Sequence, residues 1–278
     1  MEVQGRRSEP PARSGGQEDA AVLTLSVFFP AHNEALNLER TVHNAFAALE
    51  RLSLGEIEVV IIDDGSTDGT GKIADGLSSR DSRIRVVHHP VNKGYGAALK
   101  SGFNAARLDW VFYSDSDGQF DLSEVALLLP FTADFDAIIG YRTQRSDHAV
   151  RKVNTLILAV LVRAVFKLHV RDVDCAFKLV RRRCLEDIGP LSSDGAMIST
   201  ELLVKLQRAG ARVAEVGVSH YPRTAGKPSG ANPKVIARAL RELISLRRSL
   251  PPSRARAVDA CHGAAATRDH HSSPPDLG

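Results

Sequence analysis

The chain has 278 residues, of which 43% are hydrophobic and 25% are charged, as is usual for a globular protein. Its net charge of +3 argues against a general nucleic-acid-binding protein, and its three cysteines are too few for a disulfide framework. No apolar stretch approaches the roughly 18 residues that a membrane-spanning helix needs, and the first residues are polar. We therefore expect a cytoplasmic protein and exclude secreted, fibrous and membrane-spanning classes.

The two ends differ in composition from the middle of the chain. Residues 1–21 and 250–278 are rich in proline, glycine, serine and charge, and their apolar residues have no regular spacing. Such segments bury too little apolar surface to offset the entropy lost on ordering, so we expect both tails to be disordered. Residues 22–249 remain for a single domain.

Short apolar runs alternate with segments of helical spacing through this domain. The runs are continuous and rich in β-branched and aromatic residues, which is typical of strands buried on both faces of a parallel sheet. They lie at 25–29, 57–62, 84–87, 110–113 and 137–139. The segments 38–49, 67–77 and 94–106 carry apolar or small residues three or four positions apart. This order predicts an α/β fold with a mostly parallel central sheet flanked by helices.

Polar residues follow three of the predicted strands at the point where each strand ends. They occupy the segments Pro30–Glu34, Asp63–Ser66 and Asp115–Gln119. Because ligands of open α/β sheets bind beyond the carboxyl ends of the strands, we expect these clusters to meet at one edge. Asp115 and Asp117 are hard oxygen ligands, which suit Mg²⁺ or Mn²⁺ bridging a diphosphate. Such a cation neutralises the charge that develops on a departing nucleoside diphosphate.

The clusters, in this order, resemble the family 2 glycosyltransferases, which have the GT-A (Rossmann-like) fold. The matching segments are Phe29–Glu34, Ile61–Thr70, Asn92–Ala98 and Asp115–Gln119. Three further segments make the chain most similar to the dolichyl- or polyprenyl-phosphate mannose or glucose synthases; they are Gly140–Arg142, Arg171–Lys178 and Arg223–Lys227. The resemblance covers roughly residues 23–245.

The resemblance implies a role for each matching residue. The donor nucleotide sugar would lie against Pro30, Ala31, His32, Glu34, Asp64, Asp115 and Ser116. A Mg²⁺ or Mn²⁺ ion would bind Asp115, Asp117 and Gln119, with Asp117 as the leading ligand. The catalytic set would be Asp117, Gln119, Glu201 and Arg142. Donor or acceptor phosphates would meet Arg142, Arg151, Lys152, Lys178, Arg223 and Lys227, with Lys234 as an alternative to Lys227.

The implied reaction is inverting transfer of one hexose from a nucleoside diphosphate sugar, of the GDP-mannose or UDP-glucose type, to polyprenyl or dolichyl phosphate. The acceptor decides whether a general base is needed. A hydroxyl acceptor needs one, usually a carboxylate, whereas a phosphate monoester is already anionic at neutral pH. Glu201 is the candidate base, and it could also orient the sugar or a basic residue, or serve as an acid at a helix N-terminus.

The distribution of charge favours a phosphate acceptor. Residues 141–184 hold eleven Lys or Arg against three acids, and residues 220–256 hold nine against one. Two alternatives remain open. One is the same fold glycosylating a soluble hydroxyl acceptor, a polysaccharide or a small metabolite, with Glu201 as the base. The other is a non-catalytic nucleotide-sugar-binding subunit that partners a membrane protein.

Residues 153–168 and 233–248 have helical spacing, broad apolar faces and basic residues. Such helices pack in a core or an interface, or they lie in a membrane surface. Because a polyprenyl chain stays in lipid, a lipid acceptor favours peripheral contact with the inner face of the membrane.

Overall fold

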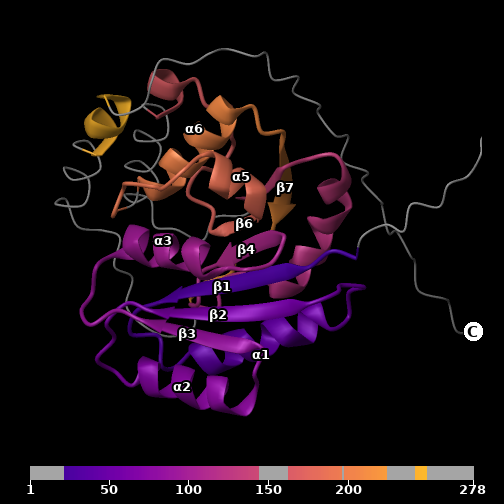
Figure 1. Cartoon of the computed structure of the whole chain (residues 1–278), viewed down its shortest axis with the longest axis vertical. Helices are drawn as coiled ribbons and strands as arrows, with labels where there is room; N and C mark the ends of the chain where they lie inside the picture. Colours follow the sequence, from indigo (N-terminus) through magenta and orange to yellow (C-terminus); the bar gives the residue numbers. More distant parts are fainter. Residues whose placement is uncertain (1–21, 144–161, 196, 224–241, 249–278) are drawn as a thin grey trace, which may run out of the picture.

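Within the residues that the computed structural model describes, 22–143, 162–195, 197–223 and 242–248, seven strands form one sheet (Figure 1). Their order across the sheet is β3-β2-β1-β4-β6-β5-β7. The strands are β1 (Leu25–Ala31), β2 (Ile57–Asp63), β3 (Ile84–His88), β4 (Trp110–Ser114), β5 (Ala137–Arg142), β6 (Phe177–Arg181) and β7 (Val213–Val218). All neighbours pair in parallel except β6, which is antiparallel to β4 and β5. The predicted mostly parallel sheet is confirmed, and the two predicted tails lie outside the described residues.

Helices cover both faces of this sheet. α1 (Leu38–Leu49) and α2 (Thr70–Arg80) lie on one face and contact each other, and α3 (Tyr95–Ala105) lies on the other face beside α6 (Ile198–Ala209) (Figure 1). The 3-10 helices η1 (Leu122–Leu127) and η2 (Leu129–Ala133) lead from β4 to β5, and α5 (Arg182–Asp187) follows β6. The predicted order of strands and helices is therefore present.

α3 packs closely on β1 because a glycine faces the strand. A Cβ atom added at Gly102 would lie 2.2 Å from a ring carbon of Phe28, well inside van der Waals contact. The Phe28 ring also stacks on Tyr113 of the neighbouring strand, with ring centroids 5.4 Å apart. The absence of a side chain at position 102 thus sets the distance between this helix and the sheet.

β1 is longer than the sequence predicts. The prediction ended this strand at Phe29 because Pro30 follows, yet β1 continues through Pro30, opposite Ile62 of β2, to Ala31. In a parallel sheet, successive residues of a strand hydrogen-bond alternately to the two neighbouring strands, and the backbone of Pro30 faces β4. The pairing of β1 with β4 ends before this point, at Phe28 and Tyr113. No N–H is needed there, so proline is tolerated in a strand that is otherwise central.

β6 and β7 lack the continuous apolar runs from which the other strands were predicted. β6 contains Lys178 in its fully buried stretch, and β7 has an exposure pattern in which buried and half-buried residues mix. A buried lysine and a half-exposed edge strand both weaken the signal from apolar periodicity. Their positions follow from the tertiary structure.

A second hydrophobic cluster lies beside the main core. It contains Val162 and Phe166 from one predicted amphipathic segment and Leu243 and Leu246 from the other, all at most 7% exposed. Residues 162–166 and 242–248 of these segments are helical. Val162, Phe166, Leu243 and Leu246 pack within the protein, whereas Val165 and Ile244 are 36% and 53% exposed. The earlier part of each segment lies outside the described residues.

The chain order places a topological switch point between β1 and β4. The chain passes from β1 outward to β2 and β3, then returns to the other side of β1 to form β4. Ligands of open α/β sheets bind at such a switch point, beyond the carboxyl ends of the strands.

Candidate functional site

The loop after β4 is fixed to the end of β1 by the serine of the Asp115-Ser116-Asp117 segment. Ser116 is buried, its hydroxyl donates to the carbonyl of Pro30 at 2.8 Å, and its own carbonyl accepts from the hydroxyl of Thr41 at 3.1 Å. Ser116 and Pro30 were predicted to contact the donor nucleotide. In the structure, these hydrogen bonds hold the segment that carries Asp115 and Asp117 at the switch point.

Asp115 and Asp117 form a like-charged pair at this switch point. The Asp115 carboxylate accepts from the Tyr95 hydroxyl at 3.1 Å, and the Asp117 carboxylate accepts from the backbone N–H of Gln119 at 3.1 Å. Burial, together with the negative charge of Asp117, raises the pKa of Asp115 to about 7. Two carboxylates that repel each other in this way are stabilised by a bound cation.

The donor set fits a divalent cation that also binds a substrate phosphate. Among the described residues, no group of three or more His, Cys, Asp or Glu side chains could hold a metal without other ligands. Mg²⁺ commonly binds one or two carboxylates and completes its coordination with substrate phosphates and water. Asp115 and Asp117 match this arrangement. Gln119 was predicted as a third ligand; its side-chain Nε2 donates to the carbonyl of Tyr221 at 2.9 Å, and a cation would bind the other side-chain atom, Oε1.

The segment after β7 runs alongside the Asp115–Gln119 loop and brings an arginine into the site. Tyr221 donates its backbone N–H to the carbonyl of Gln119 at 2.8 Å, which aligns the two segments. Arg223 then reaches Asp117, with Nη2 and Oδ2 2.8 Å apart, and Glu34, with Nη1 and Oε1 3.1 Å apart. We call these two ion pairs the Arg223 bridge. Arg223 was predicted to bind a phosphate; here it pairs with two carboxylates.

The loop after β1 is held by contacts with β2 and its following loop. The His32 ring nitrogen Nδ1 lies 2.8 Å from the carbonyl oxygen of Asp64, and His32 is exposed. Ala31 is 1% exposed within β1 and accepts from the backbone N–H of Asp64. Glu34 is buried and also accepts from the Asn37 side-chain amide at 2.7 Å. Of the predicted nucleotide contacts on this loop, His32 is the one that faces solvent.

Asp64 organises the loop after β3. Its two carboxylate oxygens accept from the backbone N–H groups of Lys93 and Gly94, each at 2.9 Å, and one of them also lies 2.6 Å from Nδ1 of His89. Asp64 is 3% exposed. The resemblance implied nucleoside binding by this carboxylate; in the structure its oxygens position the N-terminus of α3. His89, Lys93 and Gly94 were not identified from the sequence as parts of this arrangement.

Arg142 and Lys178, which were predicted to meet phosphates, make internal contacts in the structure. Arg142 forms two short bonds to the buried Asp172, at 2.7 and 2.9 Å. Lys178 is 0% exposed, and its ammonium donates to the backbone carbonyls of Val173, at 3.1 Å, and Cys175. Lys178 thus stabilises the loop before β6, and a phosphate could reach it only if that loop moved. The sequence prediction missed that Lys178 lies within a buried strand.

Glu201, predicted to be catalytic, is a buried structural carboxylate. It is 0% exposed and accepts from the backbone N–H groups of Ser192 and Ser193 at 2.9 and 2.8 Å, with Lys205 3.0 Å away. Although burial raises its pKa, these hydrogen bonds more than compensate and lower the pKa of Glu201 below its usual value. A carboxylate with occupied oxygens and a lowered pKa is poorly suited to act as a general base. The interpretation of Glu201 as an acid in the first turn of a helix is the one that fits.

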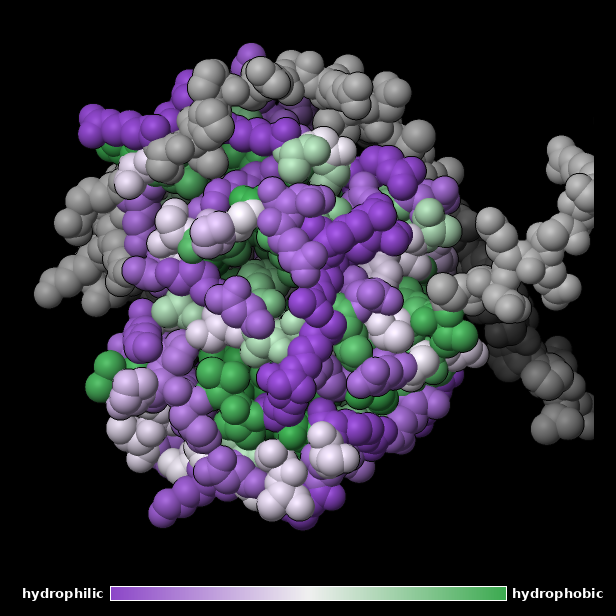
Figure 2. Space-filling view, in the orientation of Figure 1, coloured by the Kyte–Doolittle hydropathy of each residue, from purple (hydrophilic) through white to green (hydrophobic). Residues whose placement is uncertain are grey.

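The predicted phosphate contacts Arg151, Lys152 and Lys227, and the alternative Lys234, lie outside the described residues. Two other cations of the stretch 141–184 have partners although they are exposed: Arg163 donates to the carbonyls of Val170 and Arg171, and Arg183 pairs with Asp136. On the face shown in Figure 2, hydrophobic residues form patches separated by hydrophilic side chains.

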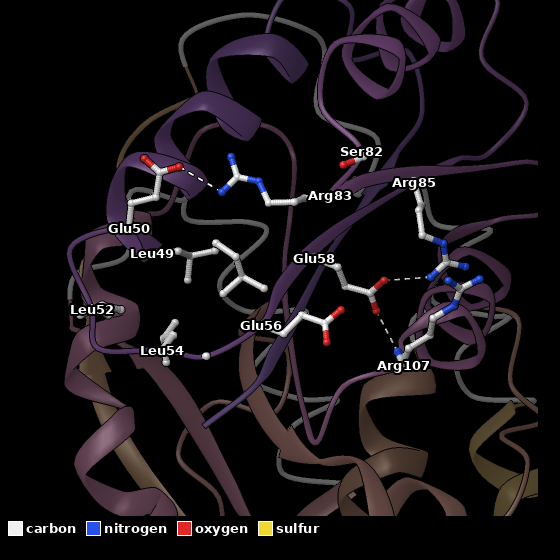
Figure 3. Close-up of a pocket in the computed structure, with 12 residues that line it drawn as sticks. Leu49, Glu50, Leu52, Leu54, Glu56, Glu58, Ser82, Arg83, Arg85 and Arg107 are labelled. Carbon is white, nitrogen blue, oxygen red and sulfur yellow. Dashed lines mark hydrogen bonds and ion pairs between the residues drawn. The ribbon is translucent and has the colours of Figure 1, made fainter. Parts of the chain in front are cut away.

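A cavity of about 580 Å³ lies at the opposite end of the strands (Figure 3). Its walls come from the end of α1 and the segments that precede β2, β3 and β4, and they include Glu58 and Arg85, which form an ion pair at 2.9 Å. Figure 3 also shows Arg83 paired with Glu50, and both residues line the cavity. Because Asp115 and Asp117 follow the carboxyl end of β4, this cavity is separate from the candidate site.

Comparison with known proteins assigns the class. Residues 26–189 match the model of glycosyl transferase family 2, and this span exceeds half of the chain, so the chain belongs to that family. The family resemblance found in the sequence is therefore confirmed.

Several curated proteins are similar in sequence to this chain, and the names of some of them specify a lipid phosphate. The chain is 35% identical over 222 residues to glycosyltransferase AglD of Haloferax volcanii, covering 77% of this chain and 36% of that protein. It is 32% identical to a dolichyl-phosphate beta-glucosyltransferase of Drosophila melanogaster, covering 59% of this chain and 56% of the enzyme. It is 30% identical to the polyprenol monophosphomannose synthase of Mycolicibacterium smegmatis, covering 84% of this chain and 91% of the synthase. The chain thus spans only about a third and about half of the first two relatives.

The fold matches solved glycosyltransferase structures. Glucosyl-3-phosphoglycerate synthase from Mycobacterium tuberculosis, in complex with Mn²⁺, uridine diphosphate and glucosyl-3-phosphoglycerate, has a TM-score of 0.60 and 23% identity. The match covers 82% of this chain and 81% of the synthase. The same enzyme bound to phosphoglyceric acid gives a TM-score of 0.62. At this identity the likeness concerns the fold, and it confirms the expected GT-A-like architecture.

Proposed function

We propose that this glycosyltransferase transfers one hexose, with inversion, from a nucleoside diphosphate sugar to the phosphate of a polyprenyl or dolichyl phosphate. The observation that carries the proposal is the pair Asp115 and Asp117 at the switch point of the sheet, with the guanidinium of Arg223 beside it. Support for the acceptor comes from relatives whose names specify dolichyl, polyprenol or undecaprenyl phosphate. The donor remains of the GDP-mannose or UDP-glucose type.

The donor diphosphate is proposed to bind at Asp115 and Asp117 together with Mg²⁺ or Mn²⁺. When bound, the cation supplies positive charge to the leaving diphosphate. Ser116 holds the two carboxylates in position through its bond to Pro30. His32, which is exposed on the loop after β1, is proposed to contact the nucleoside.

A phosphate acceptor agrees with the state of Glu201. An acceptor hydroxyl has to lose a proton as it attacks, whereas a phosphate oxygen is already anionic at neutral pH and needs only positioning and charge screening. Glu201, the candidate base for a hydroxyl acceptor, is buried and fully hydrogen-bonded. The alternative reaction on a soluble hydroxyl acceptor therefore loses the residue on which it depended.

The bonds made and broken follow from this choice. An oxygen of the acceptor phosphate attacks C1 of the hexose on the face opposite the leaving group, and a new C1–O bond forms as the bond from C1 to the diphosphate oxygen breaks. The electron pair of the broken bond stays on the diphosphate. No proton moves at the acceptor, and inversion at C1 gives a lipid-phosphate sugar with a β linkage from an α-linked donor.

We further propose that the chain works at the cytoplasmic face of a membrane through peripheral contact, because the acceptor's polyprenyl chain stays in lipid. No helix within the described ranges is long and apolar enough to cross a bilayer. Basic residues of the stretches 141–184 and 220–256 are available in the sequence to meet anionic lipid head groups.

The test is a transfer assay with the purified full chain, Mg²⁺ or Mn²⁺, and a panel of radiolabelled GDP- and UDP-sugars, each with and without polyprenyl phosphate in detergent. The proposal expects label to enter the organic phase with one donor and only when the lipid is present. Asp117→Asn is the matched control: it should fold like the wild type and transfer at least about 100-fold less label, since several kcal/mol of charge stabilisation are removed. Donor consumption without lipid labelling would favour a soluble acceptor, and donor binding without any turnover would favour a non-catalytic subunit.

A further inference from the structure

We propose that the guanidinium of Arg223 supplies the positive charge that balances Asp117 when no divalent cation is bound. The cation and Arg223 therefore compete for this carboxylate, and cation binding breaks the ion pair between Arg223 and Asp117. The inference rests on the proposed cation site of the preceding section. It adds a step that the proposed reaction does not contain: an exchange of one positive charge for another before the donor is bound productively.

The first support is the way the segment after β7 is placed. Ser219 donates its backbone N–H and its hydroxyl to the carboxylate of Glu124, at 2.7 and 2.6 Å, and Tyr221 is paired with Gln119 through two hydrogen bonds. An isolated bridge between Phe120 and His220 lies between these contacts. Arg223 is thus delivered to Asp117 by a segment with several independent anchors, and its contact is a defined feature of the fold.

The second support is the burial of the carboxylates that Arg223 joins. The side chains of Asp117 and Glu34 are 8% and 10% exposed, whereas that of Arg223 is 25% exposed. A carboxylate so enclosed requires a counter-charge, because removal of its partner leaves an uncompensated buried charge. Arg223 supplies this charge when no cation is bound. A divalent cation at Asp117 supplies it in turn, and the two cannot contact Asp117 closely together without repelling each other.

The third support is that Arg223 has a second partner. Glu34 holds one end of the guanidinium and is itself held by the side-chain amide of Asn37. When Arg223 separates from Asp117, its ion pair with Glu34 therefore keeps it in the site. A guanidinium has five N–H donors, and those that leave Asp117 become free to pair with a phosphate oxygen. The predicted phosphate contact of Arg223 then belongs to the cation-bound state.

The experiment measures Mn²⁺ binding to the full chain without nucleotide or acceptor, by electron paramagnetic resonance of free Mn²⁺ during a titration. We expect Arg223→Gln to tighten Mn²⁺ binding about tenfold, the size expected when one competing charge-assisted pair is removed. Arg223→Lys keeps the charge without the forked geometry and should lie between the two. Arg83→Gln is the matched control, since Arg83 also joins two carboxylates, those of Glu50 and Asp81, but lies far from Asp117 at the amino ends of the strands; it should bind like the wild type.

A second measurement uses the wild-type chain and so does not depend on the folding of a variant. Phenylglyoxal modifies accessible guanidinium groups, and its reaction at Arg223 can be followed by mass spectrometry of peptides. Mn²⁺ should speed modification of Arg223 severalfold and leave that of Arg83 unchanged, which separates release of Arg223 from a general electrostatic effect.

Unchanged or weaker Mn²⁺ binding by a folded Arg223→Gln chain would overturn the inference, as would a modification rate of Arg223 that Mn²⁺ leaves unchanged or lowers. Neither measurement involves a sugar donor or a lipid. Failure of sugar transfer to polyprenyl phosphate would therefore refute the proposed acceptor without touching this inference. Failure of the Mn²⁺ measurements would remove the exchange at Asp117 and leave the transfer assay to stand by itself.

Discussion

Glu201→Gln separates the structural role of this residue from the role of a general base. The substitution preserves size and replaces one carboxylate oxygen by an NH₂ group. In the wild type, Oε1 accepts from the N–H of Ser192 and Oε2 accepts from the N–H of Ser193. In either orientation of the glutamine amide, its NH₂ group therefore faces a backbone N–H, and one buried donor loses its acceptor.

The expected loss of stability follows from these contacts. A buried N–H without an acceptor costs about 1–3 kcal/mol. The loss of charge also weakens the remaining bonds and the pair with the largely buried Lys205, which adds up to about 1 kcal/mol. We therefore expect Glu201→Gln to lower the free energy of unfolding by about 2–4 kcal/mol at neutral pH.

The pH dependence of this loss has a defined sign. The pKa of Glu201 is lower in the folded chain than its ordinary value of 4.5. Its charge therefore contributes full stability above about pH 4.5, and this contribution disappears as the pH falls through the folded pKa. Glutamine does not titrate, so the difference between wild type and Glu201→Gln should narrow below pH 4.5.

The assay is urea unfolding followed by far-ultraviolet circular dichroism at pH 7.5 and at pH 4, combined with sugar-transfer rates at a temperature where both chains are folded. Glu186→Gln serves as the control, because Glu186 pairs with Arg182 on an exposed surface and should change stability by less than about 0.5 kcal/mol. The rate per folded molecule of Glu201→Gln should remain within about threefold of the wild type, whereas loss of a general base costs about 100-fold or more. Unchanged stability together with a rate loss of that size would refute our reasoning.

Two further predictions concern packing and pH. Gly102→Ala should destabilise the chain by about 1–3 kcal/mol, because the new Cβ would lie 2.2 Å from the Phe28 ring. Gly76→Ala, whose Cβ would meet nothing nearer than 3.7 Å, should instead stabilise helix α2 by up to about 1 kcal/mol. Equal unfolding midpoints of the two variants in a thermal melt would contradict this prediction. A hydrogen bond to Asp63 raises the pKa of His88 above 6.5, so the stability that their partly exposed pair contributes is present below pH 6.5 and is lost as the pH rises through the folded pKa. His88→Gln should therefore lose more stability at pH 6 than at pH 9, by under about 1 kcal/mol, and an NMR titration in which His88 has a pKa below 6.5 would refute the assignment.

The polar clusters after the strands could be located from the sequence because their position is a local property. Each follows a continuous apolar run, and parallel strands place their carboxyl ends at one edge of the sheet. Asp115 and Asp117 were found in this way, and the family was identified from the same segments. The end of β1 was predicted wrongly because of Pro30. Its missing N–H does no harm because of the register of β1 with β4, and that register is a property of the whole sheet.

The roles of charged residues depended on partners that are distant in the sequence. Glu201 was the candidate base, yet the backbone N–H groups of Ser192 and Ser193 occupy its oxygens. Lys178 was a candidate phosphate contact, yet it is buried in β6. Arg223 reaches Asp117 only because the segment after β7 lies along the loop after β4. A carboxylate or an ammonium ion has the same chemistry in any sequence context, but its pKa, exposure and contacts are set by groups that the fold brings together. The amino-acid sequence by itself therefore determined the class of enzyme and the edge of the sheet where its site lies. The tertiary structure decided which of the ionisable residues remain available there, because burial and pairing act over distances in space and not along the chain.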